Sequence, residues 1–145
     1  HTRSDRDWSS DVCSSDLQNA DVVICVEVDA EVIAGSSRMK AGTAQKMVLN
    51  MLTTASMIKI GKTYKNLMID LKPTNEKLKD RAIRIVSEIA QVSYGKALEV
   101  LLDTDWEIKT SIVSIVKSTD KETARLELKK HGGVLRKVLR EKIGV

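Results

Sequence analysis

Residues 75–90, NEKLKDRAIRIVSEIA, place apolar side chains at the spacing of one helix face, namely Leu78, Ala82, Ile85, Val86 and Ile89. Similar spacing recurs in residues 93–102 and 107–116, and Gly132-Gly133 divides the remaining sequence into two further helices. The chain contains no Phe and only 3% aromatic residues, so any core must consist mainly of Val, Ile, Leu, Met and Ala. The sequence therefore predicts a mostly helical chain, with residues 72–145 forming an all-α subdomain.

Polar residues mark where these helices start. Pro73 favours an extended conformation at Lys72, and Thr74 is a candidate cap for the helix that follows. Thr119 with Glu122 fits a capping box for the helix that ends at Gly132-Gly133.

Upstream, residues 21–28, DVVICVEV, form an almost unbroken β-branched run, a pattern typical of a strand buried in a parallel sheet. Cys25 in this run should behave as a small buried hydrophobic residue. Such a strand needs neighbours, and the only later candidate, residues 67–71, is short. The sequence therefore predicts an α/β fragment at residues 18–71, with the rest of its sheet in sequence that precedes this chain.

The first 17 residues, HTRSDRDWSSDVCSSDL, show neither helical nor strand periodicity. Residues 7–17 resemble a translated sequencing adapter, so we treat residues 1–17 as a non-native tail and expect the natural sequence to start near Gln18, in mid-fold. Without Cys13 in that tail, Cys25 has no disulfide partner, which suits a reducing compartment. The sequence has no signal peptide or membrane span, and a cytoplasmic protein is expected.

Residues 35–44, GSSRMKAGTA, place small and hydroxyl residues and two cations at the start of a helix that should reach about Ile60. Free N–H groups and the helix dipole attract anions there, whereas cations are unfavourable unless an anion binds. The candidate anion-binding residues are Ser36, Ser37, Arg38 and Lys40. Alternatively, Ser36 caps the helix while Arg38 and Lys40 pair with an acidic neighbour such as Glu31. Apolar residues cover much of the helix circumference, which predicts a largely buried helix.

The run from Glu31 to Lys46, EVIAGSSRMKAGTAQK, closely resembles a signature shared by N-acetylmuramic acid 6-phosphate etherases and the animal glucokinase regulatory protein. Segments within residues 61–78 and the tripeptide His131-Gly132-Gly133 resemble the etherase version. The resemblance covers residues 18–145. It departs at residues 105–107, Asp-Trp-Glu, where a turn containing Gly or Asn is expected.

The resemblance implies a sugar isomerase (SIS) domain with a doubly wound parallel sheet, of which residues 18–71 would supply the last strand and helix. Residues 72–145 would then form a helical subdomain similar to a ubiquitin-associated fold. The resemblance also implies homodimers in the cytoplasm, and we expect neither a cofactor nor a metal. The family's enzymes are lyases that cleave the D-lactyl ether of N-acetylmuramic acid 6-phosphate, giving N-acetylglucosamine 6-phosphate and D-lactate in cell-wall recycling.

The same resemblance implies that glutamates act as base and acid in this elimination and that they lie upstream of the present chain. No catalytic residue is therefore expected here, and the chain alone should be inactive. Ser36, Ser37, Arg38 and Lys40 are the predicted substrate-binding residues. His131 is either a helix C-terminal residue or a neighbour of the sugar site. The alternative function is a non-enzymatic sugar-phosphate regulator of the glucokinase regulatory protein type.

A third possibility is a nucleic-acid-binding helical module, because basic residues are frequent near the C-terminus: Lys129, Lys130, Arg136, Lys137 and Arg140. This stretch has no aromatic residues for base stacking, and Glu127 and Glu141 interrupt its charge. We therefore predict a phosphorylated amino sugar as partner, with neither nucleic acid nor membrane.

Overall fold

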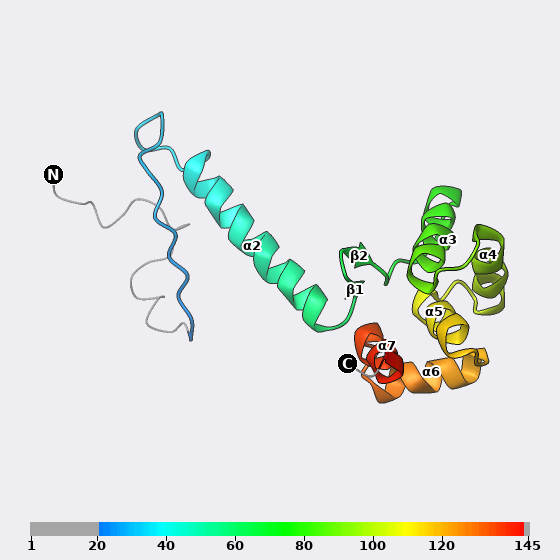
Figure 1. Ribbon diagram of the computed structural model, residues 1–145. Coiled ribbons are helices and arrows are strands. Elements are labelled where there is room, and N and C mark those ends of the chain that lie inside the picture. The colour runs from blue at the N-terminus through cyan, green and yellow to red at the C-terminus, as the bar shows by residue number, and fades with distance from the viewer. Residues whose placement is uncertain (1–20, 144–145) are drawn as a thin grey trace. The chain divides into compact units, whose positions relative to one another are not determined.

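The structure is a computed structural model that describes residues 21–143 and divides into two compact units, His1–Thr54 and Ala55–Val145 (Figure 1). The adapter-like residues 1–17, including Cys13, lie outside the described residues. The described part is mostly helical, as predicted, with six helices and one short hairpin. In chain order these are α2 (Lys40–Lys59), β1 (Thr63–Tyr64), β2 (Leu67–Met68), α3 (Glu76–Ala90), α4 (Tyr94–Asp103), α5 (Ile108–Lys117), α6 (Lys121–Lys130) and α7 (Leu135–Ile143). The predicted boundaries after residues 17 and 71 stay predictions.

The apolar run at residues 21–28 forms no β-ladder, so the predicted strand is not present in the described structure. Val22 is 77% exposed and Cys25 is exposed as well, contrary to the expected burial. The physical reason is that a strand requires hydrogen-bonding neighbours, and residues 21–143 supply none for this run.

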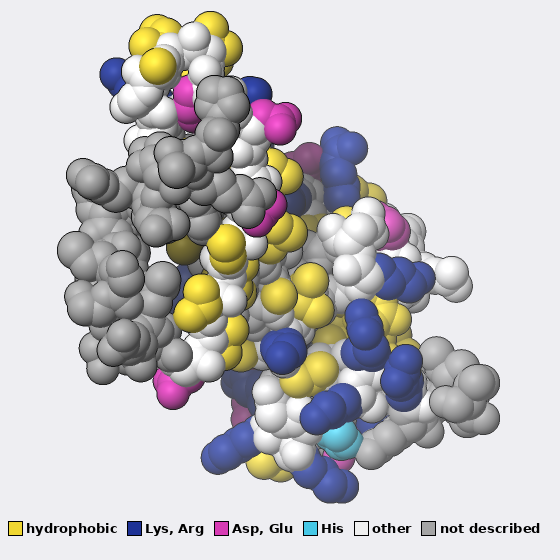
Figure 2. Space-filling view, turned by 90° about the vertical axis from the view of Figure 1, so that its left-hand side faces the viewer, with side chains coloured by type: hydrophobic (Ala, Val, Ile, Leu, Met, Phe, Trp, Pro, Cys, Tyr) yellow, Lys and Arg dark blue, Asp and Glu magenta, His cyan; other side chains and the backbone are white. Residues whose placement is uncertain are grey.

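Helix α2 is also more exposed than its composition predicts. None of its residues is buried, and Met51 and Leu52 are 59% and 49% exposed. Hydrophobic side chains (yellow) are visible on the molecular surface in Figure 2. The prediction of a largely buried helix is therefore wrong for this structure, since no residue of α2 is buried within the described part of the chain.

The C-terminus of α2 is closed by a glycine in the left-handed region. Gly61 has φ = +73°, its N–H donates to the carbonyl of Ile58 over 3.1 Å, and the N–H of Lys62 donates to Met57 over 3.0 Å. This pair of hydrogen bonds defines a Schellman motif, in which a residue with positive φ satisfies the last free carbonyls of a helix. The predicted end of this helix near Ile60 is confirmed.

The chain then forms the antiparallel hairpin β1–β2, in which Thr63 pairs with Met68 and Tyr64 with Leu67. The short candidate strand at residues 67–71 thus shrinks to Leu67–Met68. Directly after it, Ile69 is only 1% exposed and joins the core of the helical array.

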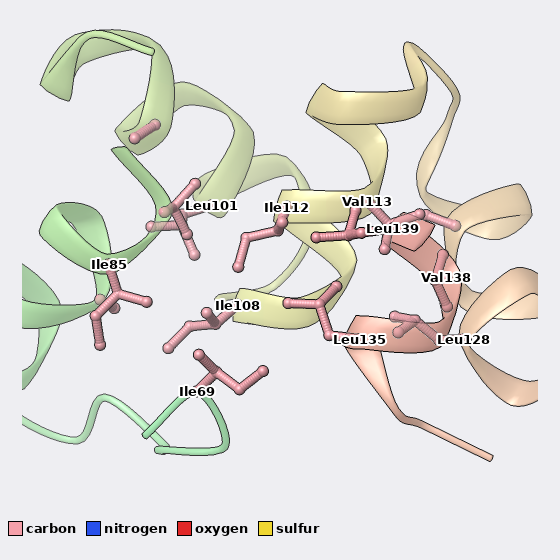
Figure 3. Packing of buried hydrophobic residues seen from close by; sticks show 14 of the residues in the cluster. Ile69, Ile85, Leu101, Ile108, Ile112, Val113, Leu128, Leu135, Val138 and Leu139 are labelled. Atoms are coloured by element: carbon pink, nitrogen blue, oxygen red, sulfur yellow. The ribbon is translucent and has the colours of Figure 1, made fainter. Parts of the chain in front are cut away.

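That core consists of aliphatic side chains from α3 to α7, with α5 in contact with α3, α4, α6 and α7 (Figure 3). The helical periodicity read from residues 75–90 is confirmed, because Ala82, Ile85 and Val86 are buried. Between α4 and α5, the buried hydroxyls of Thr104 and Ser111 lie 2.6 Å apart and also bond to backbone carbonyls. These hydrogen bonds compensate the burial of two polar groups.

Two predicted caps are displaced by one residue. The side chain of Asn75, not Thr74, accepts the N–H of Leu78 over 2.9 Å, and Asn is at least as good a cap as Thr. Asp120, not Thr119, accepts the N–H of Thr123 over 2.9 Å. Thr119 is already engaged, because its N–H donates to the carbonyl of Ser114 and so ends α5.

Candidate functional site

The predicted anion site is the loop that leads into α2. Gly35 has φ = +77°, and the N–H of Ser36 donates to the carbonyl of Ile33 over 3.1 Å, which turns the chain toward the helix. The helix begins at Lys40, later than the serines suggest. A Cβ atom on Gly42 would lie 3.2 Å from the carbonyl oxygen of Ser37, so the glycine allows the loop to fold closely against the first turn.

A carboxylate from the same unit occupies the helix start. Oε1 of Glu31 accepts the backbone N–H of Lys40 over 2.9 Å and that of Ala41 over 3.2 Å. Helix N-termini favour negative charge, and the first turn of α2 contains no acidic residue of its own. Glu31 therefore supplies this charge from a position nine residues before Lys40 in the chain.

The four predicted substrate-binding residues lie together on this loop and the first helical turn. Ser36 is partly buried, and its Oγ lies 3.5 Å from the N–H of Arg38, at the limit of a hydrogen bond. Ser37, Arg38 and Lys40 are exposed. Within residues 21–143, no ion pair joins Arg38 or Lys40 to a carboxylate, so the alternative in which they pair with Glu31 is wrong.

The geometry of this loop can hold one anionic group. Two backbone N–H groups already bind a carboxylate oxygen, while the hydroxyl of Ser37 and the charges of Arg38 and Lys40 remain exposed around them. A phosphate would need the same kinds of donor, either in place of Glu31 or beside it. Sequence reasoning missed the role of Glu31, because no local pattern links a residue to a helix start so far along the chain.

His131 lies at the end of α6, as the simpler of its two interpretations predicts. It is the C-cap residue of the helix, and its ring Nδ1 lies 2.8 Å from the carbonyl oxygen of Glu127. Lys and Arg side chains (dark blue) gather on the lower part of the face drawn in Figure 2. Glu127, which was expected to interrupt this charge, forms an ion pair with Lys117 over 3.1 Å. Whether His131 approaches a sugar stays a prediction.

No helix of the described chain is both long enough and apolar enough to cross a membrane. Over residues 21–143, there is also no cluster of three or more His, Cys, Asp or Glu side chains suited to a metal ion.

Comparisons with known proteins show which proteins this chain is similar to. A family model described as the C-terminal lid domain of glucokinase regulatory protein matches residues 65–131. N-acetylmuramic acid 6-phosphate etherases of Yersinia pestis (strain Pestoides F) and Yersinia pseudotuberculosis serotype O:3 (strain YPIII) are each 51% identical to this chain over 122 residues. That alignment covers 84% of the chain but only 41% of either relative, so the chain spans about two fifths of their length. The resemblance read from the signature at residues 31–46 is thus confirmed, and the chain is related over most of its length to the N-acetylmuramic acid 6-phosphate etherases.

Proposed function

We propose that this chain is part of a lyase that cleaves the D-lactyl ether of N-acetylmuramic acid 6-phosphate. The observation that supports this proposal most strongly is the 51% identity over 122 residues to proteins named for that activity. The products would be N-acetylglucosamine 6-phosphate and D-lactate, and the protein would act as a cytoplasmic homodimer in cell-wall recycling.

Within this proposal, the loop before α2 binds the phosphate of the amino sugar. Ser36, Ser37, Arg38 and Lys40 are the binding residues, and the backbone N–H groups of α2 that hold Glu31 provide the nearby positive end of the helix dipole. Residues 18–71 would be the last part of a SIS domain, and residues 72–145 a subdomain similar to a ubiquitin-associated fold.

We assign the base and acid of the elimination to no carboxylate of this chain. Glu31 caps α2, Glu76 pairs with Lys79 over 2.8 Å, and Glu107 binds Arg125 over 3.0 Å. Each of these carboxylates therefore has a structural partner. The proton transfers would require glutamates from the upstream part of the complete protein.

An assay of D-lactate release tests the proposal. The 145-residue chain should release none from N-acetylmuramic acid 6-phosphate, whereas a chimera with the N-terminal part of the Yersinia pestis relative should be active. In the chimera, the double variant Arg38→Ala with Lys40→Ala should raise the KM for the phosphorylated substrate. The rise should exceed that caused by the matched control, Lys129→Ala with Lys130→Ala. Equal effects of the two double variants would reject the assignment of the phosphate site, and an inactive, folded chimera would reject the lyase function.

A second candidate function is supported by the family match at residues 65–131, whose description names a regulatory protein. In that case the completed protein would bind a sugar phosphate and release no D-lactate. The same chimera separates the two functions, because binding without turnover is expected only of a regulator.

A further inference from the structure

The unit Ala55–Val145, called the helical unit below, contains an open groove of about 570 Å³, within the usual size range of small-molecule sites. One side is the segment of residues 69–74 that connects the hairpin to α3. The other side consists of the α4–α5 turn and the first turn of α5. Ile69, Ile108 and Leu128 form a buried apolar floor, and the rim contains charged and hydroxyl groups.

The α4–α5 turn has an unusual backbone. Asp105 and Trp106 have φ values of 55° and 62°, so two consecutive residues with full side chains adopt the left-handed region that Gly or Asn prefers. This is also the point where the sequence departs from the expected Gly- or Asn-containing turn. The strain places an indole ring at the groove, with the ammonium of Lys79 5.6 Å from the ring centroid.

Arg125 on α6 forms hydrogen bonds to two carboxylates of this turn. Its Nε and Nη2 donate to the two carboxylate oxygens of Glu107 over 3.0 and 3.1 Å, and Nη2 also reaches Asp105 over 3.3 Å. A bidentate guanidinium–carboxylate pair fixes orientation as well as distance. The two carboxylates nevertheless keep exposed surface, with side chains 72% exposed at Asp105 and 46% at Glu107.

Some polar side chains at the groove have hydrogen-bonding partners within the fold, and others have none among the described residues. Lys109 binds Asp70 over 3.3 Å and the carbonyl of Gly133 over 3.2 Å, so its charge is neutralised within the fold. By contrast, Lys72, Thr74 and the indole N–H of Trp106 have no hydrogen-bonding partner within residues 21–143. Among the described residues, the groove thus offers the ammonium of Lys72 and the neutral donors of Thr74 and Trp106 without a protein partner.

We propose that this groove is a binding site for an anionic pyranose sugar, separate from the loop before α2. The C–H face of a pyranose ring can lie against the indole and the apolar floor, because an aromatic ring presents a flat apolar surface. The exposed carboxylates of Asp105 and Glu107 are acceptors only, and they require the donors that sugar hydroxyls supply. The free ammonium of Lys72 would attract a negatively charged group, so the groove should bind an anionic sugar more tightly than a neutral one.

Equilibrium dialysis of the full chain carrying Arg38→Ala and Lys40→Ala, which disables the other anion site, tests this inference. Glucose 6-phosphate and glucuronate are the two anionic probes, and they separate phosphate from carboxylate as the preferred charge. Glucose is the neutral probe, and benzoate is an aromatic anion without hydroxyls. We expect either anionic sugar to bind more tightly than glucose, and benzoate to bind least.

Two variants locate the site. Trp106→Asn should weaken sugar binding by roughly tenfold or more, since the ring contact is lost. Lys72→Ala, an exposed change that leaves the fold intact, should remove the preference for anionic sugars, whereas the control Lys130→Ala should not. Undiminished binding in Trp106→Asn, an anion preference that survives Lys72→Ala, tighter binding of benzoate than of the sugars, or no saturable binding of any sugar would overturn the proposal.

Discussion

Replacing Gly61 with Ala tests how the turn after α2 packs against Val134 within the unit Ala55–Val145. A Cβ atom at this position would lie 2.9 Å from both Cα and Cγ2 of Val134, a distance that real Cβ contacts essentially never show. Because one of these atoms belongs to the backbone, a rotamer change cannot remove the collision. The residue also has φ = +73°, which costs Ala about 1 kcal/mol relative to Gly.

Gly132 offers a matched control in the same fold. It occupies the equivalent position of a second Schellman motif, with its N–H bonded to Lys129 over 3.1 Å and that of Gly133 to Leu128 over 2.7 Å. Its φ of +65° is similar, but a Cβ atom there would meet nothing within 4 Å. Gly132→Ala should therefore cost only the conformational term of about 1 kcal/mol.

Gly61→Ala should cost that term plus about 1–3 kcal/mol for the displacement of Val134, so about 2–4 kcal/mol in total. Urea unfolding followed by circular dichroism measures both variants in the full chain. Equal losses in the two variants would show that Gly61 does not pack on Val134 and would refute the reasoning.

Three further predictions concern the helical unit. Ser118→Gly should raise the free energy of unfolding by about 1 kcal/mol, because Ser118 has φ = 51° at the end of α5, and an unchanged urea midpoint would contradict this. Ile112→Ala should cost about 2–5 kcal/mol, since this side chain is 0% exposed, whereas Leu126→Ala at a 67% exposed site should change stability by about 0.5 kcal/mol or less. The hydrogen bond from Arg125 lowers the pKa of Glu107. The stabilisation that ionised Glu107 provides is therefore complete above the ordinary glutamate pKa. It is lost as the pH falls through the lower pKa that Glu107 has in the folded state. Urea midpoints measured over this acid range should fall less steeply for Glu107→Gln than for the wild type, and parallel curves would argue against a role for this ion pair.

The helical unit could be predicted well from sequence because its information is local. The spacing in residues 75–90 identified one buried face of α3, and the helix ends expected near Ile60 and at Gly132-Gly133 are true helix ends. Burial adds to this pattern, since Ile83 is only 5% exposed although it lies outside the predicted stripe. The caps were misplaced by one residue for a similar reason, because neighbouring polar residues compete for the position and the preceding helix end decides between them.

Residues 21–60 show the opposite case. An apolar run such as residues 22–26 specifies that the segment should be covered, but it does not specify by what. The prediction of burial for α2 and of a strand at residues 21–28 depended on neighbours that the described residues do not contain. Composition alone therefore predicted correctly that these segments are apolar. It predicted wrongly that they are buried.

The loop before α2 shows why a binding motif and its occupant are separate questions. Sequence identified an anion-attracting helix start from Ser36, Arg38 and Lys40, and the structure places an anion there, but the anion is the carboxylate of Glu31. An internal carboxylate is held at a high effective concentration, so a free ligand must bind more strongly than the helix dipole alone allows. The charges of Arg38 and Lys40 favour a doubly charged phosphate over a singly charged carboxylate, since Coulomb attraction scales with charge. Any ligand that replaces Glu31 must displace the same carboxylate whatever its own charge, so within the proposed function Glu31 weakens the binding of all anions alike, and Glu31→Gln should strengthen acetate and phosphate by a similar factor. Binding measurements on the full chain with acetate and phosphate test this, and unchanged affinities in Glu31→Gln would show that neither anion competes with Glu31 at the helix start.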